Sequence, residues 1–362
     1  MLVTNVKHFT VLLILFFVFV VTTGCSKQQQ IENDLLAYQS RLSGFTGIKI
    51  QQQNQVSAQL NAPLKNSLKQ NIEQIYINLR ELYALQDCTL NQVVAQRNTA
   101  LGKMQLPSKR YSYEIALLEE LANCKAQLLA KGDGENVSSI LNQLENWEKQ
   151  KKKQLPLVWS NFITQSDEIY LHISSTSSYI SGDEEDNFIA SKQAWKALSG
   201  HMEVFISFQS FRENIDKLGL PSPEKIEQHL QQLDQSRLLA RMWKTQLLMT
   251  NLLNNTTPLL EEYLLANTCS NSKQADDIVI MRNIFTMFFA EKIQSLAAEL
   301  NKYHYQIAPL VLPLTESDIL PSSYKDYLKR QLVTNHNAYK SAMKIHIESW
   351  QQIFARCAQK NI

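Results

Sequence analysis

Cysteine is the residue in this chain whose chemistry is easiest to place. The sequence has five cysteines. Cys25 lies near the amino terminus, and in an exported protein the other four meet an oxidising compartment, where an even number of thiols forms disulfides. Four cysteines allow three pairings, and sequence order favours the two local ones. We therefore expect disulfides between Cys88 and Cys124 and between Cys269 and Cys357.

The sequence before Cys25 indicates export. Lys7 is the only fixed side-chain charge of this segment, and residues 11–21 form an unbroken apolar run. Such a run is about right for a signal-peptide core, whereas a membrane-spanning helix needs about 20 apolar residues. The small residues 22–24 before the cysteine resemble the bacterial lipobox, in which the cysteine sulfur takes a diacylglyceryl group and the preceding peptide is removed.

We therefore expect residues 1–24 to be a lipoprotein signal peptide and Cys25 to be the lipid anchor. The alternative is an ordinary secretory signal that ends near a cysteine. Inner-membrane retention of lipoproteins usually goes with Asp directly after the lipidated cysteine, and Ser26 stands there. This implies the periplasmic face of the outer membrane as the location, with the lipid as the contact to the membrane.

Arg97 and Glu114 are charged residues on helical faces that are otherwise apolar. Each belongs to a series of residues, otherwise leucines or valines, that follow one another at spacings of three and four. In an antiparallel hairpin that turns near residues 105–106, Arg97 and Glu114 face each other, as do the cysteines of the first pair. We predict a partly buried Arg97–Glu114 ion pair that fixes helix register and orients Asn98 and Tyr113. The alternative is that Arg97 extends along the stripe to water.

The sequence contains no compact catalytic or cofactor-binding motif. HExxH, GxSxG, the Walker loop, GxGxxG and zinc-spaced Cys/His clusters do not occur. The acidic run at residues 182–186 lacks the ligand spacing of an EF-hand and would complement the dipole of a following helix. We expect no metal and no cofactor, although an active site assembled from distant residues leaves no such motif.

Composition favours a helical protein. Lys and Arg number 36 and Asp and Glu 34, so no net charge favours nucleic acid as a partner. Gly and Pro number nine each in 362 residues, which is well below average usage and leaves few turns. We expect an all-α fold, an elongated multi-helix bundle with long antiparallel helices and little or no β structure.

Hydrophobic periodicity and loop composition divide the chain. After the signal we place an anchor with an amino-terminal linker or helix at 25–62, a helical subdomain with the Cys88/Cys124 hairpin at 63–173, and a second helical subdomain with Cys269 and Cys357 at 187–362. The boundary is the polar segment 174–186, and we expect the two subdomains to pack as one unit.

Individual helices are also predicted. The spacing of apolar residues predicts a helix from residue 63 to about 83, and a last helix from about 323 to 357. Pro156 and Pro258 are expected to interrupt helices.

The residues from Cys88 to Cys124 carry a recognisable pattern, made of Cys88, Arg97, Asn98, Leu101, Gly102, Pro107, Ser108, Tyr113, Glu114 and Cys124. In that order they resemble an uncharacterised gammaproteobacterial lipoprotein family catalogued as domain of unknown function 3080. The signal, the overall length and the late Cys357 also fit this family. The resemblance implies a lipoprotein and assigns no activity.

Together these features predict a lipid-anchored, helical cell-envelope protein that binds or scaffolds an unidentified envelope partner. The missing catalytic motifs lean against an enzyme. Two alternatives remain open. One is an envelope hydrolase with a non-local active site. The other is a carrier with an apolar groove, to which the aromatic residues of 285–290 would contribute.

Overall fold

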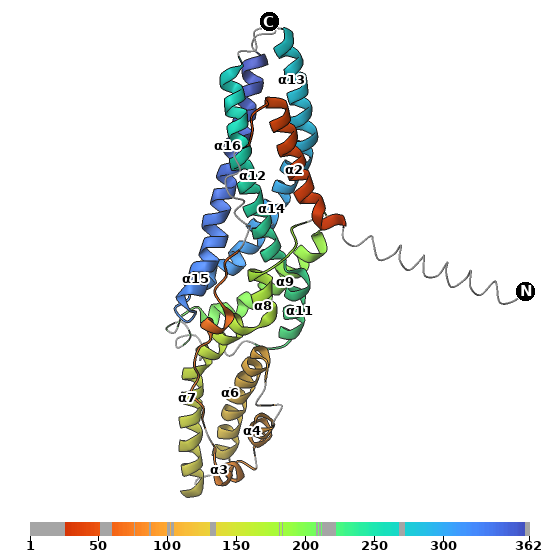
Figure 1. The fold of residues 1–362 in the computed structure, drawn as a ribbon. Coiled ribbons are helices and arrows are strands. Elements are labelled where there is room, and N and C mark those ends of the chain that lie inside the picture. Colours follow the sequence, from red (N-terminus) through yellow and green to blue (C-terminus); the bar gives the residue numbers. More distant parts are fainter. Residues whose placement is uncertain are drawn as a thin grey trace, which may run out of the picture.

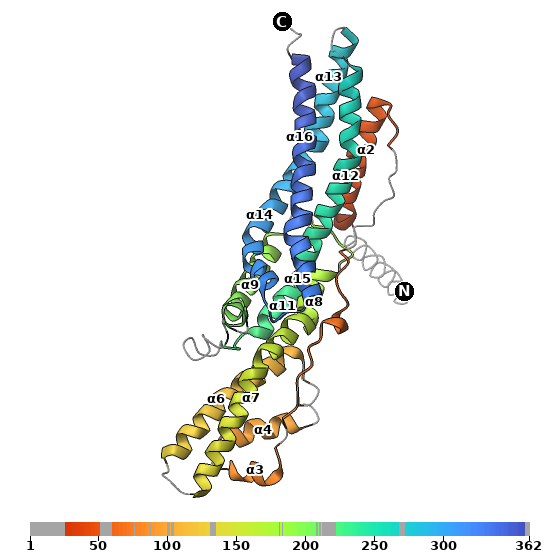
Figure 2. The same cartoon turned by 90° about the vertical axis from the view of Figure 1, so that its left-hand side faces the viewer.

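The computed structural model describes residues 26–358 except 51–59, 76, 87, 100–101, 103–104, 131–134, 181, 183, 208, 210, 212–221 and 268–271. Within these residues the fold is all-α and no strand occurs, so the predicted fold class is confirmed. Figures 1 and 2 show an elongated molecule whose longest helices run roughly along its long axis.

One end of the molecule, here called the hairpin end, is built from two long antiparallel helices. They are α6 (Pro107–Ala130) and α7 (Glu135–Gln165), which pack along each other. The short helices α3 (Leu79–Ala84) and α4 (Leu90–Asn98) lie beside them, and α4 packs on α6 (Figure 1). α7 continues into the middle of the molecule, where it contacts α8 (Asp167–Ser174).

The rest of the chain forms the middle and the opposite end. α11 (Ile226–Ser236) packs on α8 and on α9 (Glu185–Phe205), while α12 (Leu238–Ala266) packs between α2 (Ser26–Thr46) and α16 (His336–Ala358) (Figure 2). The remaining elements are the short 3₁₀ helix η1 (Lys65–Leu68), α13 (Ser272–Ile284), the π-helix η2 (Phe285–Gln294), α14 (Ser295–Val311), the 3₁₀ helix η3 (Leu312–Glu316), α15 (Ser322–Lys329) and the π-helix η4 (Arg330–Asn335).

Two long helices contain π-helical segments without a break. α15, η4 and α16 form one continuous helix from Ser322 to Ala358, so the last helix predicted from periodicity is confirmed. α13, η2 and α14 are continuous in the same way. The extra residue per turn in a π segment shifts the buried face, which lets one helix follow a core that changes direction.

Proline does not interrupt the helices where we expected it to. Pro156 lies inside α7 and Pro258 inside α12. Before Pro258, the hydroxyls of Thr256 and Thr257 donate to the carbonyls of Leu252 at 2.9 Å and Leu253 at 2.7 Å. These hydroxyls thus bond carbonyls in the turn before Pro258, where the proline weakens the backbone hydrogen bonding of the helix. The residues on both sides of Pro258 are buried, and this burial offsets the remaining free-energy cost of the proline.

A buried polar chain ties α2, α12 and α16 together. Trp350 Nε1 donates to Tyr38 Oη at 3.0 Å, and Tyr38 Oη lies 2.5 Å from His346 Nε2. His346 Nδ1 lies 2.9 Å from Thr257 Oγ1, whose proton goes to the carbonyl of Leu253. These donors and acceptors match for a neutral imidazole, and burial lowers the pKa of His346 to about 3.

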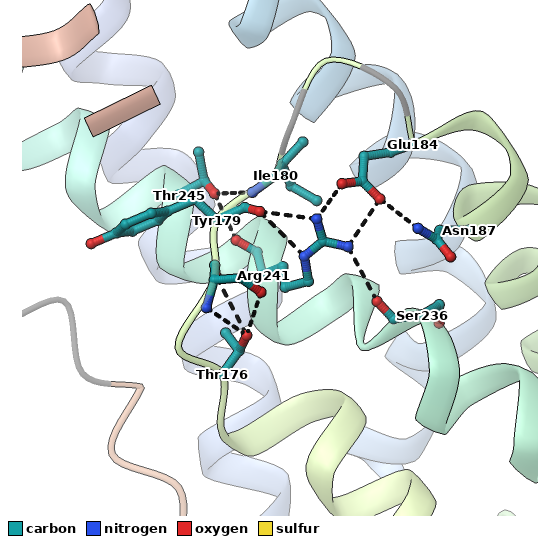
Figure 3. A network of polar contacts seen from close by, with 9 residues as sticks. Thr176, Tyr179, Ile180, Glu184, Asn187, Ser236, Arg241 and Thr245 are labelled. Carbon is teal, nitrogen blue, oxygen red and sulfur yellow. Dashed lines mark hydrogen bonds and ion pairs between the residues drawn. The ribbon is translucent and has the colours of Figure 1, made fainter. Parts of the chain in front are cut away.

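The polar segment after α8 is fastened to α12 by several side chains of α12, among which Arg241 makes the most bonds (Figure 3). Arg241 donates from Nη1 to Glu184 at 2.9 Å and from Nη2 to the carbonyl of Tyr179 at 3.0 Å. The Ile180 N–H donates to Thr245 at 2.9 Å. α9 then starts at Glu185, with acidic residues in its first turn as predicted. The subdomain boundary predicted here stays a prediction.

Candidate functional site

The disulfide between Cys88 and Cys124 is confirmed. Their Cα atoms are 5.3 Å apart and both residues are buried. Cys88 directly precedes the turn into α4 and Cys124 lies on α6, so the bond holds α4 against α6. The relative position of these two helices is therefore fixed covalently at one end.

Glu114 is buried on α6, as predicted from its place on the apolar stripe, but its partners differ from the predicted one. Its carboxylate pairs with Arg110, one turn earlier on α6, and with Lys151 of α7 at 3.0 Å. The predicted Arg97–Glu114 ion pair is wrong. α6 forms its antiparallel hairpin with α7, while α4 lies to one side. The side of α6 that carries Glu114 therefore packs against α7.

Arg97 bonds the turn that follows its own helix. Its guanidinium donates to the carbonyl of Gly102, and the Gly102 N–H donates to Thr99 Oγ1 at 3.0 Å. The Nε of Arg97 is buried without a hydrogen-bond partner among the described residues. Burial and the neighbouring Arg110 lower the pKa of Arg97.

Gly102 packs directly on the end of α4. A Cβ at this position would lie 2.3 Å from the carbonyl oxygen of Gln96 and 2.7 Å from that of Arg97. Because backbone oxygens cannot rotate away, Gly102→Ala should lower the free energy of unfolding by about 1–3 kcal/mol.

Denaturant unfolding of the purified protein measures this effect. Gly200→Ala in α9 is the matched control, since a Cβ there meets nothing within 4 Å, and alanine in a helix interior should be neutral or stabilising by up to about 1 kcal/mol. Equal stabilities for the two variants would contradict the close approach at Gly102.

A cavity of about 500 Å³ lies between α4, α6, α7 and the non-helical residues 69–75 and 77–78. We call it the hairpin cavity. Its polar lining residues are Gln74, Arg97, Asn98, Arg110, Tyr113 and Lys151, and its apolar lining residues are Ile75, Ile77, Leu90, Val94, Leu117, Leu121 and Trp147. Arg97, Asn98 and Tyr113, three of the four residues of the predicted ion-pair group, therefore line one cavity, and Glu114 pairs with two of its cations.

The polar lining residues influence one another. Burial raises the pKa of Tyr113 to about 12, with the carboxylate of Glu114 acting in the same direction, so the phenol keeps its proton. The guanidinium carbon of Arg110 lies 5.5 Å from the ring centroid of Tyr113. Burial lowers the pKa of Lys151, and Glu114 opposes that shift. The cavity thus presents cations and a phenol donor.

Residues 69–75 and 77–78 are not helical, so the helix predicted at 63–83 is wrong there, and sequence reasoning missed this wall of the cavity. Side chains of α7 bond its backbone instead. Asn161 accepts from the N–H of Gln70 at 2.7 Å and donates to its carbonyl at 2.8 Å, and Gln154 donates to the carbonyl of Glu73 at 2.9 Å. The only sequence signal for this arrangement is the set of amide side chains on α7.

A second cavity, of about 450 Å³, lies between α2, η2 and α14. Its lining includes Asp34 and Lys292, which form an ion pair, and also Glu291. Charges of both signs therefore occur together in this cavity, in contrast to the hairpin cavity.

The other predicted site residues are placed as follows. Cys25 and Cys269 lie outside the described residues, and Ser26 is the first residue of α2. Cys357 is buried and disulfide-bonded, but its predicted pairing with Cys269 stays a prediction. In the part of the chain that the structure covers, no group of three or more His, Cys, Asp or Glu residues is arranged to hold a metal ion.

Comparison with known proteins gives one match. The family model described as Protein of unknown function (DUF3080) matches residues 35–360. No curated protein and no solved structure matches the chain. Among the described helices, none combines the length and the apolar character that crossing a membrane requires.

Proposed function

The chain belongs to the family Protein of unknown function (DUF3080), and we propose that it is a lipid-anchored, non-enzymatic binding protein of the bacterial cell envelope. In this proposal residues 1–24 are a signal peptide, Cys25 carries a diacylglyceryl thioether, and Ser26 directs the protein to the outer membrane. The apolar run and the small residues before Cys25 support the anchor. An anchor of two or three acyl chains holds a protein on a membrane stably.

The hairpin cavity is the observation that carries the binding role. A cavity of about 500 Å³ with both charged and apolar lining residues is within the range of about 300–1,000 Å³ typical of small-molecule sites. The Cys88–Cys124 disulfide fixes two of its walls, which reduces the cost of ordering them on binding.

Replacing Cys25 tests the anchor. Cells are grown with an alkyne-tagged palmitate, and the chain is then followed by label incorporation and by separation of inner membrane, outer membrane and soluble fractions. The wild-type chain should carry the label and sediment with the outer membrane. Cys25→Ser should lose the label and appear in the soluble fraction or as an unprocessed precursor.

Two variants of the next residue serve as controls. Ser26→Ala should keep both label and location, whereas Ser26→Asp should keep the label and move to the inner membrane. A Cys25→Ser chain that is still labelled, or that sediments with the outer membrane after normal processing, would count against the anchor.

A further inference from the structure

The charges that line the hairpin cavity have one sign. Arg97, Arg110 and Lys151 line it, and no carboxylate does so among the described residues. The nearest carboxylate, Glu114, is already shared by Arg110 and Lys151. Three cations therefore face one buried anion. Burial lowers the pKa of Arg97, and the neighbouring Arg110 acts in the same direction.

One donor of this group is unsatisfied. The Nε of Arg97 is buried without a partner in the described part of the chain. Leaving a buried donor unpaired costs free energy, more so when the group is charged. An anion at this end of the cavity would accept from Arg97 and would also reduce the repulsion among the three cations.

Polar and apolar lining residues are segregated along the cavity. On α6 the lining residues run from Arg110 and Tyr113 to Leu117 and Leu121. At a rise of 1.5 Å per residue, Arg110 and Leu121 are roughly 16 Å apart along the axis. The face of α6 that lines the cavity therefore changes from polar to apolar in the direction of the disulfide.

The two neighbouring helices repeat this order with the opposite chain direction. α4 places Arg97 at the polar end and Leu90 at the apolar end, while α7 places Lys151 at the polar end and Trp147 at the apolar end. The Lys151–Glu114 and Cys88–Cys124 contacts fix this register. Three helices thus agree on which end of the cavity is charged.

We infer that the hairpin cavity binds a single-chain amphiphile whose anionic head lies among Arg97, Arg110 and Lys151 and whose apolar tail lies against Leu117, Leu121 and Trp147. A charged head without a tail would leave the apolar end unfilled, and a neutral chain would leave the positive charge in excess of Glu114 uncompensated. A fatty-acid carboxylate and a lipid phosphate share the required chemistry. The inference rests on the proposed binding role but does not need the lipid anchor.

Photo-crosslinking of the full chain in isolated membranes tests the inference. The probes are dodecanoate, dodecyl phosphate and dodecanol, each with a diazirine at the tail end, and labelled peptides are mapped by mass spectrometry. Either anionic probe should label the apolar end of the cavity, at residues 90–94, 117–121 or 147, and excess unlabelled dodecanoate should compete. The preferred anionic probe identifies the head group as carboxylate or phosphate. Dodecanol should label these residues at least about tenfold less.

Variants separate head from tail recognition. Arg97→Gln should reduce labelling by at least about tenfold. Lys149→Gln is the matched control, because Lys149 is an exposed cation on α7 that does not line the cavity. Val94→Trp, at a half-buried lining position, should block labelling by filling the apolar end. Thermal unfolding and the Cys88–Cys124 disulfide are checked for each variant.

The readout does not depend on the anchor. If the chain is recovered in the soluble fraction, the same labelling there would support the inference while the proposed anchor fails. Equal labelling by dodecanol and dodecanoate, labelling outside the cavity, or equal labelling of folded Arg97→Gln and Lys149→Gln would each overturn the inference.

Discussion

Replacing Arg241 with methionine lowers the free energy of unfolding by about 3–5 kcal/mol. The side chain of Glu184, its partner, is only 2% exposed, and the variant removes the guanidinium that pairs with this buried carboxylate. The carbonyl of Tyr179 also loses the guanidinium that bonds it (Figure 3). Tyr179 and Glu184 both lie between α8 and α9, so the variant weakens the attachment of this part of the chain to α12, where Lys244 and Thr245 still bond it.

Urea unfolding measures the loss, and Arg237→Met is the matched control. Arg237 pairs with Asp234, but both side chains are more than 40% exposed, so this change should cost about 1 kcal/mol or less. The double variant Arg241→Met with Glu184→Gln should recover part of the loss, because the buried charge of Glu184 is removed as well. A cost for Arg241→Met no larger than that of the control would contradict the structure.

Acid is expected to unfold the protein while most carboxylates are still ionised. Five buried histidines have a lowered pKa with burial as the main cause: His172, His201 and His336 at about 4, and His304 and His346 at about 3. In the unfolded chain each titrates near 6.5. Below that pH the unfolded state binds protons that the folded state does not, so stability falls as the pH drops from about 6.5 toward 4.

The two fully buried rings allow an estimate. His172 and His346 are 0% exposed, and between pH 6.5 and pH 5 each should cost the folded state about 2 kcal/mol at 1.36 kcal/mol per pH unit. The other three rings, which are less deeply buried, should add smaller losses.

Urea unfolding at pH 7, 6 and 5 measures this slope. In His346→Gln the slope of the unfolding free energy against pH should be smaller, by the amount that corresponds to about one bound proton. This holds whatever the stability of the variant at pH 7. Stability that does not change between pH 7 and pH 5 would contradict the neutral, buried histidines.

The parts of the fold that sequence predicted correctly depend on short-range patterns. The last helix follows from a long series of apolar residues at helical spacing. The Cys88–Cys124 disulfide follows because the two cysteines are equally far along the chain from one predicted turn. The inward orientation of Glu114 follows from its helical phase. The last helix and the orientation of Glu114 need no knowledge of which other helix is nearby, and the disulfide needs only that α4 and α6, which are neighbours in the chain, lie side by side.

The predictions that failed concern features that depend on which helices lie next to each other. Apolar residues between 63 and 83 recur at helical spacing, but amide side chains of α7 bond the backbone at Gln70 and Glu73, and residues 69–75 and 77–78 are not helical. The predicted partner of Glu114 was wrong because α7, the helix that follows α6 in sequence, packs more closely on α6 than α4 does. The hairpin cavity needs α4, α6, α7 and these non-helical residues together, so no single stretch of sequence could predict it.

The hydrogen bonds along α7 have a consequence for how this family can vary over evolution. Gln154, Asn161 and Gln165 bind the main chain of the segment beside them, at Glu73, Gln70 and Lys65 respectively. Every residue type offers the same carbonyl, so drift in the segment itself leaves these bonds intact. Among homologues, substitutions should therefore accumulate at exposed positions such as 69 and 71 while the three amides on α7 persist.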